Sequence, residues 1–272
     1  MISAVALFAG LCLEAGASPV VLDFETEDDF STPLVNGQVV DLSFDTDDVE
    51  FGRLVSIRSK QLGQPDGHLG VTVFDSSSSG VNSSGRDVDL LVNLGNILIL
   101  QSAEFPVSSV DPTYGLRYET PDDEDRHWMR GSIVFDFIDP VELTSIVVID
   151  ADEGFRGDFV LTDDTGKTRS YVVPSDWTFD RSIDGPDGFQ TLFLDSLAPQ
   201  VGEGGATATA VEDLGFDPTR VRQLEVQFNG SPGSGGLDNL VIVPEPSTIF
   251  LALLGFFATI GLTWRNRRLR TA

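Results

Sequence analysis

Hydrophobic and polar residues alternate along several short segments of the chain. Residues 222–229 place Leu224, Val226 and Phe228 on one face, with polar residues between them. Residues 133–137 repeat this pattern, which is the period of a half-buried β-strand. Residues 146–149 are continuously apolar and mostly β-branched, which is typical of a strand buried on both faces. Further strands are expected at residues 71–74, 97–100 and 237–243.

Turn signals separate these segments. Residues 158–162 and 167–173 are joined by Asp163-Asp164-Thr165-Gly166, which predicts a hairpin with a positive φ at Gly166. No amphipathic helix is expected before residue 244, and loops are expected at residues 76–86, 105–130 and 201–210. The pattern predicts an all-β fold, an antiparallel two-sheet sandwich of the jelly-roll kind, over residues 18–243.

The last 29 residues have a different pattern. Val243-Pro244-Glu245-Pro246-Ser247 is followed by an uncharged apolar run, residues 249–264, and then by four arginines. Proline ends the preceding structure, and the apolar run as a helix would be about 24 Å long. We expect one transmembrane helix at residues 248–264, with its basic end in the cytoplasm and everything before it outside. The basic end comprises Arg265, Arg267, Arg268 and Arg270.

This tail, residues 244–272 with Val243 before it, closely resembles the PEP-CTERM sorting signal of bacteria that make extracellular polysaccharide. The resemblance implies recognition by a membrane enzyme, exosortase, and cleavage near Pro-Glu-Pro that releases the protein or attaches it to the surface. An ordinary C-terminal anchor with a proline-rich neck is the alternative. The resemblance predicts where the cell sends the protein, and it says nothing about an activity.

The beginning of the chain agrees with export. Residues 2–13 are apolar, and Ala15-Gly16-Ala17 fits the cleavage site of a signal peptide spanning residues 1–17, although no Lys or Arg precedes the apolar run. The only cysteine, Cys12, lies inside this segment and follows Leu11, which is too large for a lipoprotein signal. The mature protein is therefore expected to have no disulfide and no thiol chemistry.

The exported segment is strongly acidic. The whole chain has a formal net charge of −26, and because two acids and four arginines lie outside residues 18–243, that segment carries −28. Nucleic acid and anionic membrane surfaces are excluded as partners, since both require a basic surface. Such a charge destabilises a compact state unless salt or bound cations screen it. Bound calcium and adaptation to a salty habitat are therefore competing explanations for the strongly acidic composition.

Calcium is the most specific candidate ligand. In residues 21–25, Asp23 and Glu25 lie on one face of the expected first strand, and the expected last strand begins near Asp238 and Asn239. The domain resembles jelly-roll carbohydrate-binding modules, in which first and last strands are neighbours and a structural calcium often lies at their edge. These four residues would supply several of the oxygens that calcium needs. A second acidic cluster comprises Asp150, Asp152, Glu153 and Asp158 and lacks the full EF-hand pattern.

Polysaccharide is the expected partner if the domain binds a ligand. Tyr114, Tyr118, Trp128 and Trp177 fall in or near expected loops and are the candidate platforms for sugar rings. The alternative is that Trp128 and Trp177 cover the core of the sandwich. Residues 70–100 also resemble exported β-sandwich proteins that often carry the same tail, which supports the architecture and adds no chemistry.

The sequence offers little support for catalysis. Asp164-Thr165-Gly166 matches the aspartic-protease triplet, but it lies in the expected hairpin turn and no second triplet exists. We expect an exported, non-enzymatic protein of the cell surface or extracellular matrix, structural or adhesive, with calcium-assisted polysaccharide binding. A secreted carbohydrate-active hydrolase using a carboxylate pair is the alternative, and a sandwich that acts without a ligand through its bulk and charge is a third possibility.

Overall fold

The computed structural model describes residues 18–27, 31–40, 54–61, 68–83, 88–102, 108–123, 131–151, 156–179, 188–229 and 235–244. These residues form β-strands and no helix, as the sequence predicts. The strands are β1 Val20–Leu22, β2 Val55–Gln61, β3 His68–Asp75, β4 Asn96–Ser102, β5 Ser108–Asp111, β6 Gly115–Tyr118, β7 Gly131–Ile149, β8 Gly157–Asp163, β9 Thr168–Val173, β10 Phe189–Phe193, β11 Gln200–Val201, β12 Thr207–Glu212, β13 Val221–Phe228 and β14 Gly236–Pro244.

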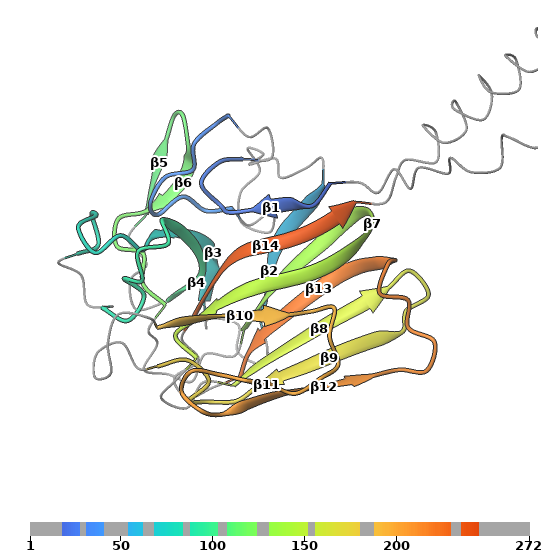
Figure 1. Ribbon diagram of the computed structural model, residues 1–272. Helices are drawn as coiled ribbons and strands as arrows, with labels where there is room; N and C mark the ends of the chain where they lie inside the picture. Colours follow the sequence, from blue (N-terminus) through green and yellow to red (C-terminus); the bar gives the residue numbers. More distant parts are fainter. Residues whose placement is uncertain are drawn as a thin grey trace, which may run out of the picture.

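Twelve strands form one hydrogen-bonded antiparallel sheet, and β5 and β6 form a separate hairpin (Figure 1). The main path through the large sheet runs β11-β12-β9-β8-β13-β7-β14-β4-β3. Three strands lie off this path: β1 pairs with β14, and both β2 and β10 pair with β7. Strand β7 therefore has more neighbours than a flat sheet allows.

Strand β7 joins two parts of the large sheet. Its first half pairs with β2 and β13, for example Phe135 with Ile57 and with Leu224. Its second half pairs with β14 and β10, and there Val148 lies opposite Leu237. The sequence predicted the two halves, residues 133–137 and 146–149, as separate strands. They are one strand of 19 residues, in which the pairing partners change near Pro140.

The main core lies between the two parts of the sheet that β7 connects. Phe159 from β8, Val226 from β13 and Leu192 from β10 belong to one buried apolar cluster. The Tyr171 hydroxyl on β9 donates a hydrogen bond to the Leu194 carbonyl just after β10, and Arg169 Nη1 donates to the same carbonyl at 3.0 Å. Residues of β9 thus reach across to β10, which is consistent with a β-sandwich.

A smaller core covers the other face of β3, β4 and the second half of β7. It contains Phe74, Ile97, Ile99 and Ile149, with residues 90–92 packed against them. Every residue of β4 is buried. Apolar packing on both faces explains why residues 146–149 are continuously apolar, whereas β13, which has one face of polar side chains, alternates.

The predicted hairpin is confirmed at β8 and β9. Asp163 Oδ1 accepts hydrogen bonds from the Thr165 and Lys167 backbone N–H groups, at 2.8 and 3.0 Å. Gly166 has φ of +83°, the conformation that this turn requires and that glycine adopts without strain. The Asp-Thr-Gly triplet is therefore part of a tight turn.

Two of the predicted loops contain strands. Residues 105–130 include the β5–β6 hairpin, whose turn is fixed by Asp111 Oδ1 accepting the Thr113 N–H at 2.7 Å. Residues 201–210 include most of β12, which pairs with β9. The small Thr and Ala residues of β12 gave no hydrophobic alternation, so only its neighbour in the sheet identifies it as a strand.

Within the described ranges, no helix is long and apolar enough to cross a membrane. The transmembrane helix predicted at residues 248–264 and the arginines after it lie outside those ranges. So do Glu245, Pro246 and Ser247 of the predicted sorting motif, and Trp128.

Candidate cation site and sorting motif

The chain turns sharply after β1 and keeps the predicted alternation. Phe24 has φ of +54°, which is rare for a bulky residue, and its buried ring stacks on Phe135 with 6.4 Å between ring centroids. Asp23 and Glu25 on either side of Phe24 are more exposed than its ring. The packing of Phe24 into the core thus holds a strained backbone and directs the two carboxylates outward.

Strand β14 carries the second half of the predicted site. β1 and β14 are antiparallel neighbours, with Leu22 opposite Leu240. The register between β14 and β7 shifts between Asp238 and Val241, and Asn239 in this irregular stretch has φ of +47°. The first and last strands therefore meet as predicted, and two strained residues, Phe24 and Asn239, lie where they meet.

Asp238 is the most unusual residue of this region, because it is 0% exposed. Asn239 Nδ2 donates to Asp238 Oδ2 at 2.7 Å. In the part of the chain that the structure describes, nothing donates to Asp238 Oδ1, although this atom is also buried. An unsatisfied buried oxygen costs about 1–3 kcal/mol, so it calls for an explanation.

The electrostatic environment of Asp238 opposes ionisation. Burial is the main cause that raises its pKa, to about 8 from an ordinary value of 3.8, and the charges of Asp23 and Glu25 raise it further. The backbone N–H of Asn239 acts in the opposite direction. Burial and the charges of Asp23 and Glu25 thus disfavour an ionised Asp238 with no counter-charge, which favours a proton or a cation at this position.

Glu25 is held in place by the start of β4. Its Oε1 accepts the Asn96 backbone N–H at 2.9 Å. Gly95 has φ of +89°, and a Cβ at this position would lie 1.8 Å from Glu25 Oε1. Asn96 Nδ2 in turn donates to the Leu34 carbonyl at 3.2 Å. Gly95 and Asn96 were not predicted as site residues, since their role depends on a neighbour about 70 positions away in the sequence.

This arrangement suits a hard cation that takes oxygen ligands. Calcium binds six to eight carboxylate, amide and carbonyl oxygens, so Asp238, Asp23 and Glu25 with Asn239 are chemically appropriate ligands. Among the described residues, no group of three or more His, Cys, Asp or Glu side chains is already arranged to hold a metal ion. The described residues therefore do not bring a full set of carboxylate ligands together at Asp238.

The second acidic cluster is divided by other contacts. Asp158 Oδ2 accepts Asn229 Nδ2 at 2.8 Å, and its Oδ1 lies 3.5 Å from Arg156 Nη2. Asp150 is buried and has φ of +59°. Asp152 and Glu153 lie outside the described residues. The described members thus provide no unsatisfied oxygen of the kind found at Asp238.

The three described candidates for sugar binding, Trp177, Tyr118 and Tyr114, differ in burial. Trp177 is fully buried in the main core, and its indole Nε1 donates to the Gln200 carbonyl at 3.1 Å. Tyr118 is also buried, whereas Tyr114 is half-buried at the tip of the β5–β6 hairpin. Trp177 and Tyr118 present no open ring face to a sugar, so among the described candidates a ligand can approach Tyr114.

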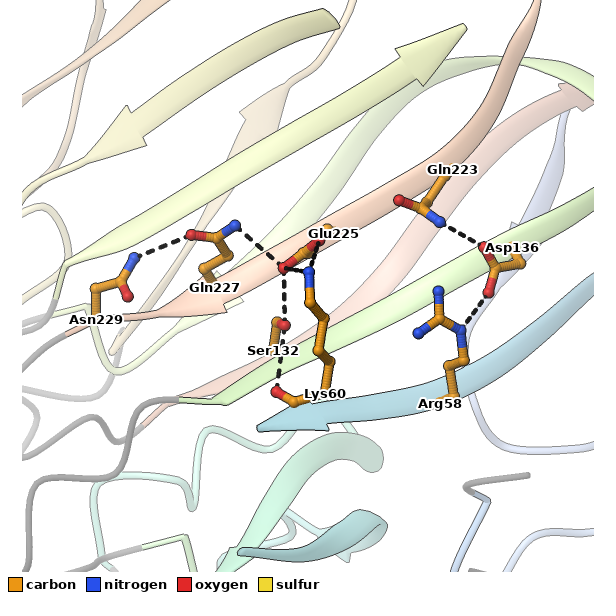
Figure 2. A network of polar contacts seen from close by, with 8 residues as sticks. All are labelled: Arg58, Lys60, Ser132, Asp136, Gln223, Glu225, Gln227 and Asn229. Carbon is orange, nitrogen blue, oxygen red and sulfur yellow. Dashed lines mark hydrogen bonds and ion pairs between the residues drawn. The ribbon is translucent and has the colours of Figure 1, made fainter. Parts of the chain in front are cut away.

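Figure 2 shows polar side chains along one face of β2, β7 and β13. Buried Glu225 accepts hydrogen bonds from Lys60 Nζ at 3.1 Å, from Ser132 Oγ at 3.0 Å and from Gln227 Nε2 at 3.1 Å. A second group joins Asp136 to Arg58 at 2.7 Å and to Gln223 at 2.6 Å. The sequence predicted that β13 has a polar face, but these cross-strand partners depend on the sheet order.

Replacing Glu225 with Ala should lower the free energy of unfolding by about 2 kcal/mol, because it removes the buried acceptor that Lys60, Ser132 and Gln227 share. Chemical denaturation measures the change. Asp136→Ala is the matched control and should cost less, because the Asp136 and Arg58 side chains are 35% and 38% exposed and water can replace the lost contacts. Equal losses in the two variants would contradict the assignment of Glu225 as the anchor of this face.

The first residues of the predicted sorting motif are part of the folded domain. Strand β14 ends at Pro244, and its last pairs are Val243 with Glu142 and Pro244 with Val141, both on β7. Comparison with protein families finds the PEP-CTERM protein-sorting motif at residues 243–268, which confirms the resemblance seen in the sequence. Comparison with curated proteins and with solved structures finds no match. The chain therefore carries a PEP-CTERM sorting signal, which marks it as an exported protein that is anchored in the membrane by its C-terminus before exosortase processes it.

Proposed function

We propose that the processed protein is a non-enzymatic, structural or adhesive component of the cell surface or extracellular matrix. Its jelly-roll-like domain binds calcium between β1 and β14 and associates with extracellular polysaccharide. The observation that carries the calcium part is the buried Asp238 Oδ1, which has no donor among the described residues. The charges of Asp23 and Glu25 also act on the Asp238 carboxyl. The sorting signal supports the location.

The charge of the domain supports a bound divalent cation. Residues 18–243 carry −28, and self-repulsion of this size opposes a compact fold. A calcium ion at Asp238 would neutralise a buried carboxylate whose ionisation the charges of Asp23 and Glu25 oppose. It would also connect the short strand β1, which has only three residues, to the last strand of the domain.

Binding at this site differs from general screening by salt. Screening acts on exposed charges and depends on ionic strength, whereas a buried pair of oxygens selects the ion by size and ligand number. Calcium should therefore raise the melting temperature at concentrations where sodium chloride of equal ionic strength does not. An equal rise with both salts would favour the adaptation to a salty habitat over a calcium site.

The partner is tested by co-sedimentation of the processed protein with the exopolysaccharide made by the same cells, in calcium and in chelator. We expect co-sedimentation in calcium, a several-fold decrease in chelator and no release of reducing ends. Tyr114→Ala should weaken binding, because Tyr114 is the described candidate aromatic that a sugar can reach. Released reducing ends would support the hydrolase alternative, and the absence of co-sedimentation in both conditions would contradict polysaccharide binding.

A further inference from the structure

The sorting motif begins inside the sheet, without a linker. The motif covers residues 243–268, and β14 runs to Pro244, so two residues belong to both. Val243 and Pro244 are half-buried and lie opposite Glu142 and Val141 of β7. A processing enzyme that binds Val243 and Pro244 must therefore bind residues that are also paired in a folded strand.

The neighbours of β14 change just before the motif. Val20, the first residue of β1, lies opposite Ile242, so β1 covers one edge of β14 up to the residue that precedes the motif. Beyond Ile242, β14 keeps its pairing with β7 only. In Figure 1 the start of β1 lies beside the end of β14. Pro244 has no N–H and cannot donate a hydrogen bond to β7, which weakens the end of the strand.

We propose that the folded domain controls access of exosortase to the sorting motif, because Val243 and Pro244 must separate from β7 before the enzyme can bind them. Enzymes that recognise peptide segments commonly bind them as extended strands, through backbone groups that a sheet neighbour would occupy. The last pairs of β14 therefore compete with the enzyme for the same residues.

The free energy needed to expose the motif is that of opening the end of β14, without unfolding the domain. The ends of strands open with small free energies compared with global unfolding, and only two residue pairs have to separate here. When opening is fast relative to cleavage, the processing rate follows the population of the opened end. Stabilising the end of β14 should slow processing, and moving the motif away from the sheet should speed it. Neither effect depends on whether calcium or polysaccharide binds.

The first test moves the motif out of the sheet. Gly-Ser-Gly-Ser is inserted between Ile242 and Val243 of the full chain, expressed together with the exosortase of the same host, and processing is followed by pulse-chase. We expect processing to become several-fold faster, because Val243 and Pro244 no longer have to leave β7. The control places the same insertion between the exposed residues Ala198 and Pro199, and it should leave the rate unchanged. An unchanged or slower rate in the Ile242 insertion alone would overturn the proposal.

The second test fixes the strand end covalently. Glu142→Cys with Val243→Cys places two cysteines opposite each other in adjacent strands, within the Cα separation that a disulfide accepts. The full chain has no cysteine other than Cys12, so mispairing is limited. Val243→Cys alone controls for the change in the motif.

In membranes that contain exosortase, the oxidised double variant should be processed at least about tenfold more slowly than the single variant, since the closed strand end can no longer open. Addition of reductant should restore the rate of the single variant. If the oxidised double variant is processed as fast as Val243→Cys, the enzyme does not need Val243 to leave β7 and the proposal is wrong.

Discussion

Replacing Asp238 with Asn is expected to remove a large pH-dependent loss of stability between about pH 4 and pH 8. The folded-state pKa of Asp238 is about 8, against an ordinary value of 3.8. Below pH 3.8 the carboxyl is protonated in both the folded and the unfolded state, so it has no effect. As the pH rises, the unfolded chain loses the proton first, and the folded state becomes less stable by about 1.4 kcal/mol per pH unit until the folded carboxyl also ionises near pH 8.

Without calcium, wild-type protein should therefore be several kcal/mol less stable at pH 7 than at pH 4 through this one group, an order-of-magnitude figure. An asparagine side chain cannot ionise, so Asp238→Asn should lack this part of the slope and be more stable than wild type at pH 7 in chelator. Chemical denaturation at a series of pH values measures both curves, and the difference between them isolates Asp238 from the other carboxylates. Parallel curves would show that Asp238 ionises normally in the folded protein.

Calcium should reverse the order of stability of wild type and Asp238→Asn at pH 7. The ion binds the ionised carboxylate, and binding to the folded state alone adds stability that grows with calcium concentration. Wild type should gain stability from calcium at pH 7, whereas Asp238→Asn should gain little. Glu203→Gln removes an exposed acid on another part of the domain and is the matched control, which should respond like wild type.

Replacing Asp163 with Ala is expected to destabilise the protein by about 3 kcal/mol, since it removes the acceptor of several charge-assisted hydrogen bonds at once. Asp163 is buried, and its carboxylate accepts the backbone N–H groups of Thr165, Lys167 and Asp217 and the Thr165 hydroxyl. It thereby holds the β8–β9 turn against residue 217, just before β13. Thermal or chemical unfolding measures the loss.

The neighbouring residue provides the control. Asp164 is exposed and makes an ion pair with Arg220, so Asp164→Ala should cost less than about 1 kcal/mol, roughly the value of a surface pair. Similar losses for the two variants would contradict the role given to Asp163.

The pH dependence at Asp163 has the opposite sign to that at Asp238. Burial alone would raise the pKa of Asp163, but the hydrogen bonds from Thr165, Asp217 and Lys167 outweigh it and lower the pKa to about 2. The stabilisation is therefore present above pH 3.8 and is lost as the pH falls toward 2. Wild type should lose stability in this range, and Asp163→Ala should lose less.

Local pattern was sufficient to predict most strands. In β13, Leu224 and Val226 alternate with polar residues because one face of the strand packs in the core and the other carries hydrogen-bonded polar side chains, and the β8–β9 turn follows from its Asp and Gly residues. Strand β7 was divided in the prediction because its two halves lie in different environments, one alternating and one buried on both faces. Which strands flank each half is set by packing, and no local pattern carries that information.

The candidate site was predictable as far as it depends on the first and last strands being neighbours. Asp23, Glu25, Asp238 and Asn239 lie where these strands meet. The contact of Glu25 with Asn96 was not predictable, because it depends on how β4 lies against the start of the chain. For the aromatic candidates the decisive quantity was burial, and Trp177 is a large core residue although its segment is rich in turn-forming residues.

Measuring calcium binding at equilibrium is the most direct test of the proposed site at Asp238. Isothermal titration of calcium into chelator-treated protein at pH 7 should show a single saturable site in wild type and in Glu203→Gln. The site should be lost, or weakened at least about tenfold, in Asp238→Asn, which removes a charged ligand. Equal calcium binding by wild type and Asp238→Asn, or no saturable binding by wild type, would contradict the assignment of this site to calcium.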